Sequence, residues 1–399
     1  METTTIGNLI SLQRGYDLTE SQRCFGKVPI VGSAGIHGYH DKARAKGPGV
    51  ALGRSGASFG RVTYVNEDYW PHNTTIFVTD FKGNEPLFVR YLLESLDFSS
   101  LNSGSAQQSL NRNYVYMVPV KHFPLPIQRR IAGILSAYDD LIENSQRRIK
   151  ILEEVARRLY REWFVHFRFP GHEGCRFVES PLGEIPEGWE VKRLGDVTTK
   201  IGSGATPKGG KGAYKTEGIH LIRSLNIYDY SFQFDNLACI DEDQAAGLDN
   251  VRVQQNDVLL NITGASVARC AMVPSYLLPA RVNQHVAIIR ADEAKVSPHY
   301  LLDAINSDFH KQKLLSYAQG GATREALTKE TISGFEIVVP PTLVMSRYAG
   351  VASGIHLHRE TLTRQIQNLR RTRDLLLPRL LSGQIDVEAL PEPALQEVG

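Results

Sequence analysis

The stretch from residue 124 to residue 169 constrains the fold more than any other part of the chain. It contains neither proline nor glycine between Gly133 and Phe169, and its apolar residues recur at alternating steps of three and four, the heptad spacing of coiled-coil helices. These apolar positions, here called the first seam, are Leu135, Tyr138, Ile142, Ile149, Leu152 and Leu159. A helix of this length extends roughly 60 Å, and it needs a partner helix to bury its seam.

A second stretch near the end of the chain, residues 340 to 385, can supply that partner. Shifted by 217 residues (Gly350 minus Gly133), it repeats the register of the first stretch, so that Ile149 falls on Ile366. Its apolar positions, the second seam, are Ile355, Leu362, Ile366, Leu369 and Leu376. Two unrelated amphipathic helices would not be expected to share a register. The pattern therefore predicts an internally duplicated chain in which the two long helices pair.

A globular module precedes each long helix. In both modules, short apolar runs separated by Gly, Asn and Asp predict strands and turns. The motif Gly56-Ala57-Ser58 with Arg61 returns 208 residues later as Gly264-Ala265-Ser266 with Arg269. We therefore predict two α/β (α+β) modules in a pseudo-twofold internal repeat, separated by two long coiled-coil helices. The predicted segments are a first module at 1–123, a long helix at 124–169, a linker at 170–188, a second module at 189–339, a long helix at 340–385 and a loose tail at 386–399.

The sequence lacks a recognisable catalytic or metal-binding set. The glycine-rich loop at 204–212 resembles a phosphate-binding loop, but Ala205 replaces its first glycine and Gly212 replaces the Ser or Thr that would hold Mg²⁺. The histidine pairs at positions 37/40 and 356/358 have no further ligands at metal-site spacing. We therefore predict no catalytic residue, no metal and no cofactor in this chain.

The cysteines and the apolar segments bear on the compartment. The four cysteines lie far apart without ligand spacing, which is typical of reduced thiols in a cytosolic protein. The first residues lack a basic segment followed by an apolar run, and no apolar stretch is long enough to span a bilayer. We expect a cytoplasmic protein that does not bind membranes.

Polar loops recur at equivalent places in the two modules. The net charge is only +2, so any nucleic-acid binding must come from local patches. Arg and Lys bind phosphate or guanine, and Asn and Gln bind adenine edges. Ordinary surface loops are the alternative for any single residue, but the recurrence favours binding. The predicted DNA-binding residues are Arg54, Ser55, Ser58, Arg61, Gln107, Gln108, Asn111 and Arg112 in the first module, and Ser203, Thr206, Lys208, Lys211, Arg223, Asn226, Ser266, Arg269, Thr323 and Arg324 in the second.

Several further motifs complete the pattern, and together they are distributed over nearly the whole chain. They are Val28-Pro29-Ile30-Val31-Gly32-Ser33-Ala34-Gly35-Ile36, Gly53-Arg54-Ser55-Gly56, Trp70-Pro71-His72-Asn73, Pro124-Leu125-Pro126-Ile127-Gln128, Trp163-Phe164-Val165 and Leu380-Leu381-Ser382-Gly383. With this set the chain resembles the specificity (S) subunits of type I restriction–modification enzymes. The second module departs from it by having Asn261-Ile262-Thr263-Gly264 where the first has Gly53-Arg54-Ser55-Gly56.

The resemblance implies a chain that recognises double-stranded DNA and catalyses nothing. Each module would be a target recognition domain for one half of a bipartite target, and the helices would pack antiparallel, space the readers and dock two methylation subunits. Those partners would bind S-adenosylmethionine and methylate a flipped-out adenine. Motor–nuclease subunits using ATP and Mg²⁺ would join them for restriction. The alternatives are a coiled-coil scaffold whose modules bind peptides, and an enzyme with a diverged site.

Overall fold

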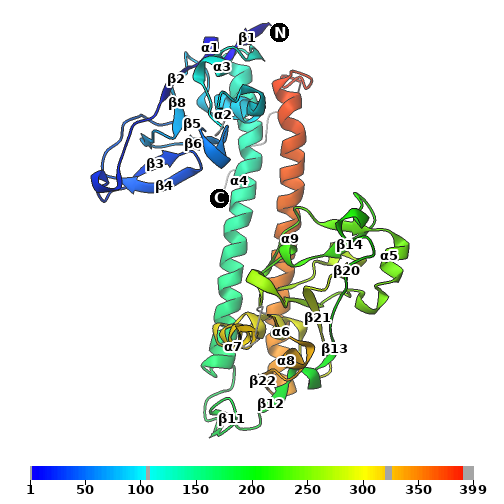
Figure 1. The fold of residues 1–399 in the computed structure, drawn as a ribbon. Helices are drawn as coiled ribbons and strands as arrows, with labels where there is room; N and C mark the ends of the chain where they lie inside the picture. Colours follow the sequence, from blue (N-terminus) through cyan, green and yellow to red (C-terminus); the bar gives the residue numbers. More distant parts are fainter. Residues whose placement is uncertain (1, 105–107, 320–325, 390–399) are drawn as a thin grey trace. The chain divides into compact units, whose positions relative to one another are not determined.

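The computed structural model describes residues 2–104, 108–319 and 326–389, and it forms two compact units. The first unit combines residues 1–144 with 365–399, and the second comprises residues 145–364. Two long helices, α4 (Leu125–Tyr160) and α9 (Thr342–Leu381), each contribute one half to each unit (Figure 1). A compact unit therefore contains one globular module together with half of each long helix.

Both long helices form where heptad spacing predicts them, with shorter ends. The first is α-helical to Tyr160 and continues as a π-helical turn over Arg161–Val165, so the regular helix ends before the predicted residue 169. The second ends at Leu381, three residues after Pro378, whose ring lacks the N–H that a helix interior requires. No helix in the described parts of the chain is both long and apolar enough to cross a membrane.

The helix halves run antiparallel within each unit. In the first unit, Ile131 and Leu135 near the start of α4 share a core with Leu380 near the end of α9. In the second unit, Phe164 after the end of α4 packs against Tyr348 near the start of α9, with ring centroids 4.7 Å apart. The antiparallel arrangement implied by the resemblance is thus present in both units.

Every predicted seam side chain is at least partly buried. Leu135, Ile142, Leu362 and Ile366 are buried. The half-buried positions are Tyr138, Ile149, Leu152, Leu159, Ile355, Leu369 and Leu376. The exposed apolar residues of the helices, such as Leu141 and Ile151, lie off the seams.

In its described residues the first module contains three small sheets, and the short helix α2 (Pro86–Glu94) packs on the four-stranded one. A four-stranded antiparallel sheet has the order β2-β8-β5-β6, a three-stranded sheet has the order β4-β3-β7 with β3 and β7 parallel, and β1 pairs with β9. The elements are β1 Thr3–Thr5, α1 Ile6–Leu9, β2 Ser11–Arg14, β3 Val28–Gly32, β4 Gly35–His40, β5 Gly49–Gly53, β6 Val62–Val65, β7 Trp70–Pro71, β8 Thr75–Asp80, α2 Pro86–Glu94, α3 Arg112–Tyr116 and β9 Pro119–Lys121.

The second module repeats this arrangement. Three of its sheets, with the orders β13-β21-β18-β19, β17-β14-β20 (with β14 and β20 parallel) and β12-β22, correspond strand for strand to those of the first module, and a two-stranded sheet β15-β16 is added. The elements are β12 Glu190–Arg193, β13 Thr198–Ser203, β14 Ile219–Ile222, β15 Ile227–Tyr228, β16 Ser231–Phe232, β17 Ala238–Ile240, α5 Glu242–Ala246, β18 Val258–Asn261, β19 Cys270–Met272, β20 Ala280–Val282, β21 Val286–Ala291, α6 Pro298–Asn306, α7 Asp308–Gln319, α8 Lys329–Ser333 and β22 Glu336–Val339. The expected fold class, two α/β modules in an internal repeat with two antiparallel long helices, is confirmed.

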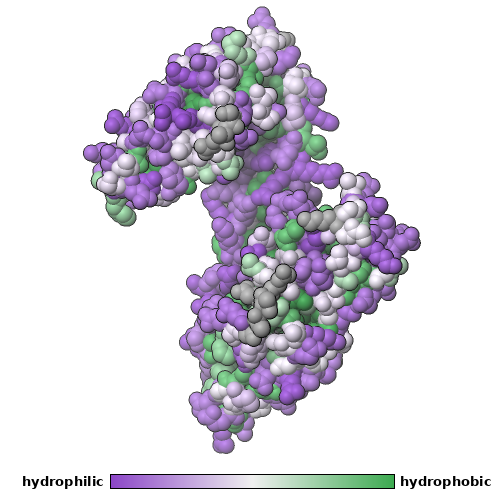
Figure 2. All heavy atoms as spheres, viewed as in Figure 1, coloured by the Kyte–Doolittle hydropathy of each residue, from purple (hydrophilic) through white to green (hydrophobic). Residues whose placement is uncertain are grey.

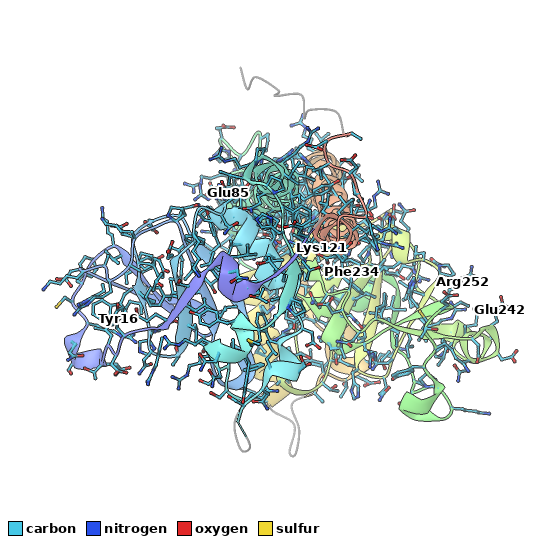
Figure 3. All side chains as sticks on the ribbon, turned by 90° about the horizontal axis from the view of Figure 1, so that it is seen from above. Tyr16, Glu85, Lys121, Phe234, Glu242 and Arg252 are labelled. Carbon is cyan, nitrogen blue, oxygen red and sulfur yellow. The ribbon has the colours of Figure 1, made fainter. Side chains whose placement is uncertain are left out.

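Each module is joined to its helices by a core and by polar contacts. In the first unit, Glu85 at the start of α2 lies beside α4 (Figure 3), where its N–H donates to Gln128 Oε1 at 2.9 Å. Buried residues of the main sheet such as Leu52 and Ile76 share one core with Phe88 of α2. Hydrophilic residues predominate on the face seen in Figure 2. Polar loops follow β5 and β18 of the two main sheets.

Candidate nucleic-acid interface

The first polar loop follows β5 and is a fixed turn. The Gly53 N–H donates to the Arg61 carbonyl at 2.8 Å, and the Gly60 N–H donates back to the Gly53 carbonyl at 2.8 Å. Gly56 and Gly60 have φ values of 77° and 74°, which glycine adopts far more readily than other residues. A Cβ at Gly53 would lie 2.0 Å from the Ser58 carbonyl oxygen, so this position also excludes a side chain.

A second polar loop, more than forty residues later, pairs with the first. Ser55 and Ser109 form an antiparallel bridge, and the Leu110 N–H donates to the Arg54 carbonyl at 2.8 Å. The structure thus brings together the two groups of residues that the sequence suggested in the first module. Gln107 lies outside the described residues. Ser58, Arg61 and Gln108 line one shallow hollow of about 510 Å³ with Phe59 and Phe98.

The side chains of this first-module site differ in how available they are. Arg61 and Gln108 are exposed, and Ser55 and Ser58 are half-buried. Arg54 is half-buried, and its buried Nε has no hydrogen-bond partner among the described residues.

Two exposed residues of the same site also have structural contacts. The Asn111 side chain caps α3 by accepting the Asn113 N–H at 3.0 Å, and the Arg112 guanidinium donates to the Leu12 carbonyl at 3.3 Å. A ligand could therefore engage Arg61 and Gln108 at the least structural cost.

The second module builds the equivalent loop from different residues. The Asn261 N–H donates to the Arg269 carbonyl and the Ala268 N–H donates to the Asn261 carbonyl, both at 2.8 Å, as at Gly53 and Gly60. Thr263 bridges to Ala326, as Ser55 bridges to Ser109. Thr323 and Arg324 lie outside the described residues.

Asn261, which stands where the first module has Gly53, is fully buried. Its amide donates to the Ser224 carbonyl at 2.9 Å and to Ser266 Oγ at 3.2 Å. The departure seen in the sequence therefore adds a tie between the loop and its neighbour, and half-buried Ser266 is part of that tie.

Two arginines of the second module lie on aromatic rings. The guanidinium of Arg269 lies 4.4 Å from the Tyr228 ring centroid, and that of Arg223 lies 5.0 Å from the Tyr214 centroid. Stacking of this kind fixes the direction of a guanidinium while keeping its charge. Sequence reasoning missed both tyrosines, because neither is adjacent in the chain to the arginine that it supports.

Asn226 was predicted among exposed loop residues, and the structure places it in the interior. It is fully buried, its Nδ2 donates to the Gln233 carbonyl at 2.9 Å, and its Oδ1 accepts the Arg223 N–H at 3.0 Å. Its amide is occupied by holding the turn that carries Arg223. Asn226 therefore positions that turn, and its buried side chain offers no group to a ligand.

The remaining predicted residues of the second module lie at the end of β13 and in the loop that follows it. Ser203, Thr206 and Lys208 are exposed, and the loop is fastened by the Gly204 N–H, which donates to the Asn283 carbonyl at 3.1 Å. The side chain of Lys211 lies outside what the structure describes.

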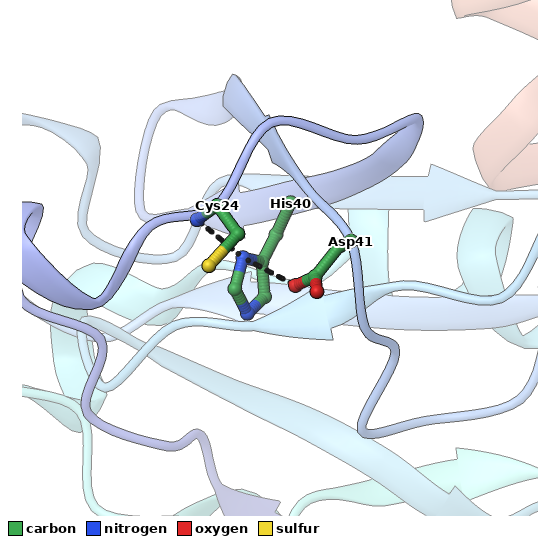
Figure 4. Close-up of side chains that lie close together, drawn as sticks. All are labelled: Cys24, His40 and Asp41. Atoms are coloured by element: carbon green, nitrogen blue, oxygen red, sulfur yellow. Dashed lines mark hydrogen bonds and ion pairs between the residues drawn. The ribbon is translucent and has the colours of Figure 1, made fainter.

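One group of described residues places three possible metal ligands within 4.8 Å of one another: Cys24, His40 and Asp41. Figure 4 shows that the imidazole is already engaged: His40 Nδ1 accepts the Cys24 N–H at 3.1 Å and lies 3.1 Å from Asp41 Oδ1. We interpret the group as a contact that fastens the Cys24 turn to the end of β4.

The second unit also contains a half-enclosed cavity of about 410 Å³. His299, His356 and Arg359 lie in its wall, and His356 Nε2 lies 3.2 Å from buried Asp303. Burial lowers the pKa of His299 to about 4, with a further contribution from His356. His356, considered in the sequence as half of a histidine pair with His358, is instead part of a buried polar network.

Comparison with known proteins bears on both modules. The family model described as the type I restriction modification DNA specificity domain matches residues 1–154 and 186–343. The MjaIX specificity subunit of a type I restriction enzyme from Methanocaldococcus jannaschii is 28% identical over 315 residues, covering 76% of this chain and 70% of that protein. The HindI specificity subunit from Haemophilus influenzae is 24% identical over 322 residues, covering 65% of this chain and 67% of that protein.

A solved structure supports the fold. The S subunit of a type I restriction–modification system from M. genitalium superposes with a TM-score of 0.68 at 14% identity, covering 95% of this chain and 96% of that one.

Proposed function

Since the chain belongs to the family of type I restriction modification DNA specificity proteins, we propose that it reads a bipartite DNA target, one half with each module. The observation that carries the proposal is the paired loop, built twice. In the first module the turn after β5 is bridged to a distant loop at Ser55 and Ser109. In the second module the turn after β18 is bridged to a distant loop at Thr263 and Ala326. Two similar but non-identical sites suit an asymmetric target with an unread gap.

The side chains differ between the two sites in a way that supports different half-sites. The first module offers exposed Arg61 and Gln108 and half-buried Arg54. The second offers Arg223 and Arg269, each held on a tyrosine ring. Arg hydrogen-bonds guanine and Gln hydrogen-bonds adenine in the major groove, so these sets favour different base patterns.

The long helices would space the readers and dock two methylation subunits, with motor–nuclease subunits completing the complex. In this proposal the partners supply S-adenosylmethionine, ATP and Mg²⁺, and this chain contributes no catalytic group. What supports the division of labour is that the polar loops offer hydrogen-bond donors, acceptors and positive charge, the chemistry of recognition.

The test compares the purified chain with the complex that it forms with its methylation subunits. The chain alone should not transfer methyl groups to DNA, and the complex should methylate one bipartite sequence. Binding should weaken steeply with salt, because phosphate contacts release counterions. Methyl transfer by the chain alone would contradict the non-catalytic role. Salt-independent association with proteins in place of DNA would instead favour a coiled-coil scaffold.

A further inference from the structure

Phe25 is a large aromatic side chain that lies fully in solvent. It stands in the turn between Gln22 and β3, and two more large apolar side chains, Ile36 and Tyr39, are about half exposed on β4 nearby. In Figure 2, hydrophobic atoms project among hydrophilic ones at the end of the lobe that Figure 1 labels β3 and β4. An aromatic ring left in water is unfavourable, and exposed apolar side chains that occur as a group mark an interaction site.

The turn that carries Phe25 is held on both sides. Before it, the Cys24 N–H donates to Nδ1 of buried His40, whose ring lies edge-on to Trp70 at 5.1 Å (Figure 4). After it, Gly26 lies so close to β4 that a Cβ would be 2.1 Å from the His40 carbonyl oxygen. The backbone at Phe25 is therefore fixed while its side chain points away from the protein.

Basic residues are frequent in the segment that carries this ring. Residues 20–46 contain five Lys or Arg and two Asp or Glu. Lys27 and Lys42 are exposed, and the guanidinium of Arg23 lies 3.2 Å from His37 Nε2, a neighbour that brings no negative charge. Basic residues near an exposed aromatic side chain are used to bind the phosphates of single strands while the ring stacks on a base, and apolar side chains can also enter a base step of a duplex.

The same hairpin reaches the proposed interface. The Ser33 N–H in the turn between β3 and β4 donates to Thr74 Oγ1 at 3.2 Å, and the Arg54 N–H donates to the Thr74 carbonyl at 2.9 Å. From Gly35 to His40 the strand rises about 17 Å, the length of about five base pairs. A duplex that contacts Arg54 and follows β4 would therefore reach Phe25.

The second module covers the equivalent edge with its own chain. Its equivalent strand, β17, is buried along its length, and the segment 241–257 that follows it folds over its sheet through α5. In the first module the corresponding segment is only residues 41–48, and β4 remains exposed at Ile36, His37 and Tyr39. The chain thus covers one edge itself and leaves the other, basic edge open.

We propose that Phe25 is a DNA-stacking residue, which places its ring against the bases of the duplex while Arg23, Lys27 and Lys42 contact the flanking phosphates. The inference rests on the proposed function and adds to it a contact outside the paired loops. Apolar side chains that enter a duplex partly unstack a base step, and this distortion can be detected at single positions.

The experiment uses the complex with methylation subunits and duplexes of the methylated sequence that carry 2-aminopurine at successive positions. The parent should raise the fluorescence at one position, about five base pairs from the base that responds to substitution of Arg54. Phe25→Ala should abolish this signal and weaken binding by about 5- to 100-fold, and Phe25→Trp should retain both. Met117→Ala, at another exposed apolar side chain of the same module, is the matched control and should change neither.

The salt dependence gives an independent arm. Lys27→Ala and Lys42→Ala should each reduce the slope of log affinity against log salt by about one, while Phe25→Ala should leave the slope unchanged. Phe25→Ala with parental affinity and fluorescence would overturn the proposal, as would an effect confined to recruitment of the methylation subunits. A parent complex without sequence-specific DNA binding would instead overturn the proposed function itself.

Discussion

In each unit a short helix of the module, α2 in the first and α6 in the second, contacts the long helices through a carboxylate. The two units differ in which helix carries that carboxylate. In the first unit the carboxylate belongs to the long helix: Asp139 on α4 accepts the Tyr91 hydroxyl of α2 at 2.7 Å. Arg90 and Arg373 complete the contact, at 3.0 and 2.6 Å from its carboxylate oxygens. About a fifth of the Asp139 side chain remains exposed.

In the second unit the carboxylate belongs to the short helix. Asp303 on α6 is fully buried, accepts the Tyr348 hydroxyl at 2.6 Å and lies 3.2 Å from His356 Nε2. Arg359 Nη1 donates to His356 Nδ1 at 3.1 Å. The arginine thereby fixes the tautomer, so that Nε2 carries the proton and donates it to Asp303.

The difference shows that duplication preserved the place of the contact and not its chemistry. Tyr91 and Asp303 occupy the same turn of α2 and α6, and Asp139 and His356 are related by the 217-residue offset of the long helices. A partly exposed ion pair contributes little to the free energy of unfolding, because water and salt screen it. A buried network is worth little over an apolar replacement but is costly to break, because the partner groups remain buried. The second unit should therefore be the more sensitive of the two.

Truncating the two carboxylates gives the largest expected contrast. Asp303→Ala leaves Tyr348 and His356 buried without their acceptor and should cost about 3–5 kcal/mol of unfolding free energy. Asp139→Ala should cost about 1–2 kcal/mol. Chemical denaturation of the full chain measures both, and equal losses would remove the distinction. Asp303→Asn, which keeps one acceptor oxygen, should recover part of the loss.

The next largest contrast should be in the pH range over which each unit loses stability. Burial lowers the pKa values of His299 and His310 in the second unit to about 4, below the ordinary value of 6.5. Their contribution is therefore complete above pH 6.5 and is lost as the pH falls toward 4, because the unfolded state binds the protons first. Burial pushes the pKa of Asp139 up, but hydrogen bonds from Arg373 and Tyr91 outweigh this and leave it below 3.8. Its contribution is lost only below about pH 4.

Tryptophan fluorescence can follow the acid response of the second unit. Trp163 and Trp189 lie in that unit and Trp70 in the first, so a Trp70→Phe background reports the second unit alone. The denaturant concentration at the midpoint of its unfolding should be lower at pH 5 than at pH 7. In the double variant His299→Phe/His310→Phe this decrease should be smaller, and an equal decrease would assign the acid response to other groups.

Long-range periodicity was the part of the fold that the sequence could predict. Heptad spacing over more than thirty residues and its recurrence 217 residues later identify α4 and α9, since no tertiary contact is needed to recognise them. The paired loops were predictable only as two separate groups of polar residues, because the bridge from Ser55 to Ser109 is a long-range pairing. Whether a polar residue is exposed also depends on its neighbours in space, and for that reason Asn226 was misplaced.

The exposed surface was the least predictable part. Nothing in the sequence around Phe25 distinguishes it from a core residue, and only the length difference between segments 41–48 and 241–257 indicates that one edge is left uncovered. The supporting tyrosines, Tyr214 and Tyr228, are likewise identified only by the fold. What the sequence misses here is the assignment of apolar side chains to the inside or the outside.

Substituting one arginine in each polar loop tests whether the readers act separately. Arg61→Ala and Arg269→Ala should each cost about 1–3 kcal/mol in DNA binding if the guanidinium reads a base. Each substitution should relax specificity in one half of the methylated sequence and leave the other half intact. Mapping the methylated sites of both variants measures this. A uniform loss over all sequences would identify a phosphate contact instead.

The smallest expected effect concerns the tie that only the second loop possesses. Asn261 donates to the Ser224 carbonyl and to Ser266 Oγ, whereas Gly53 in the first module has no side chain to face Ser58. Ser266→Ala should therefore cost about 1 kcal/mol of unfolding free energy, and Ser58→Ala close to none. A double-mutant cycle of Asn261→Ala with Ser266→Ala isolates the pair, and its coupling should be about 0.5–1 kcal/mol. A coupling near zero would mean that backbone hydrogen bonds alone hold the loop. In that case the second module, despite its extra side chain, would present its arginines on the same scaffold as the first.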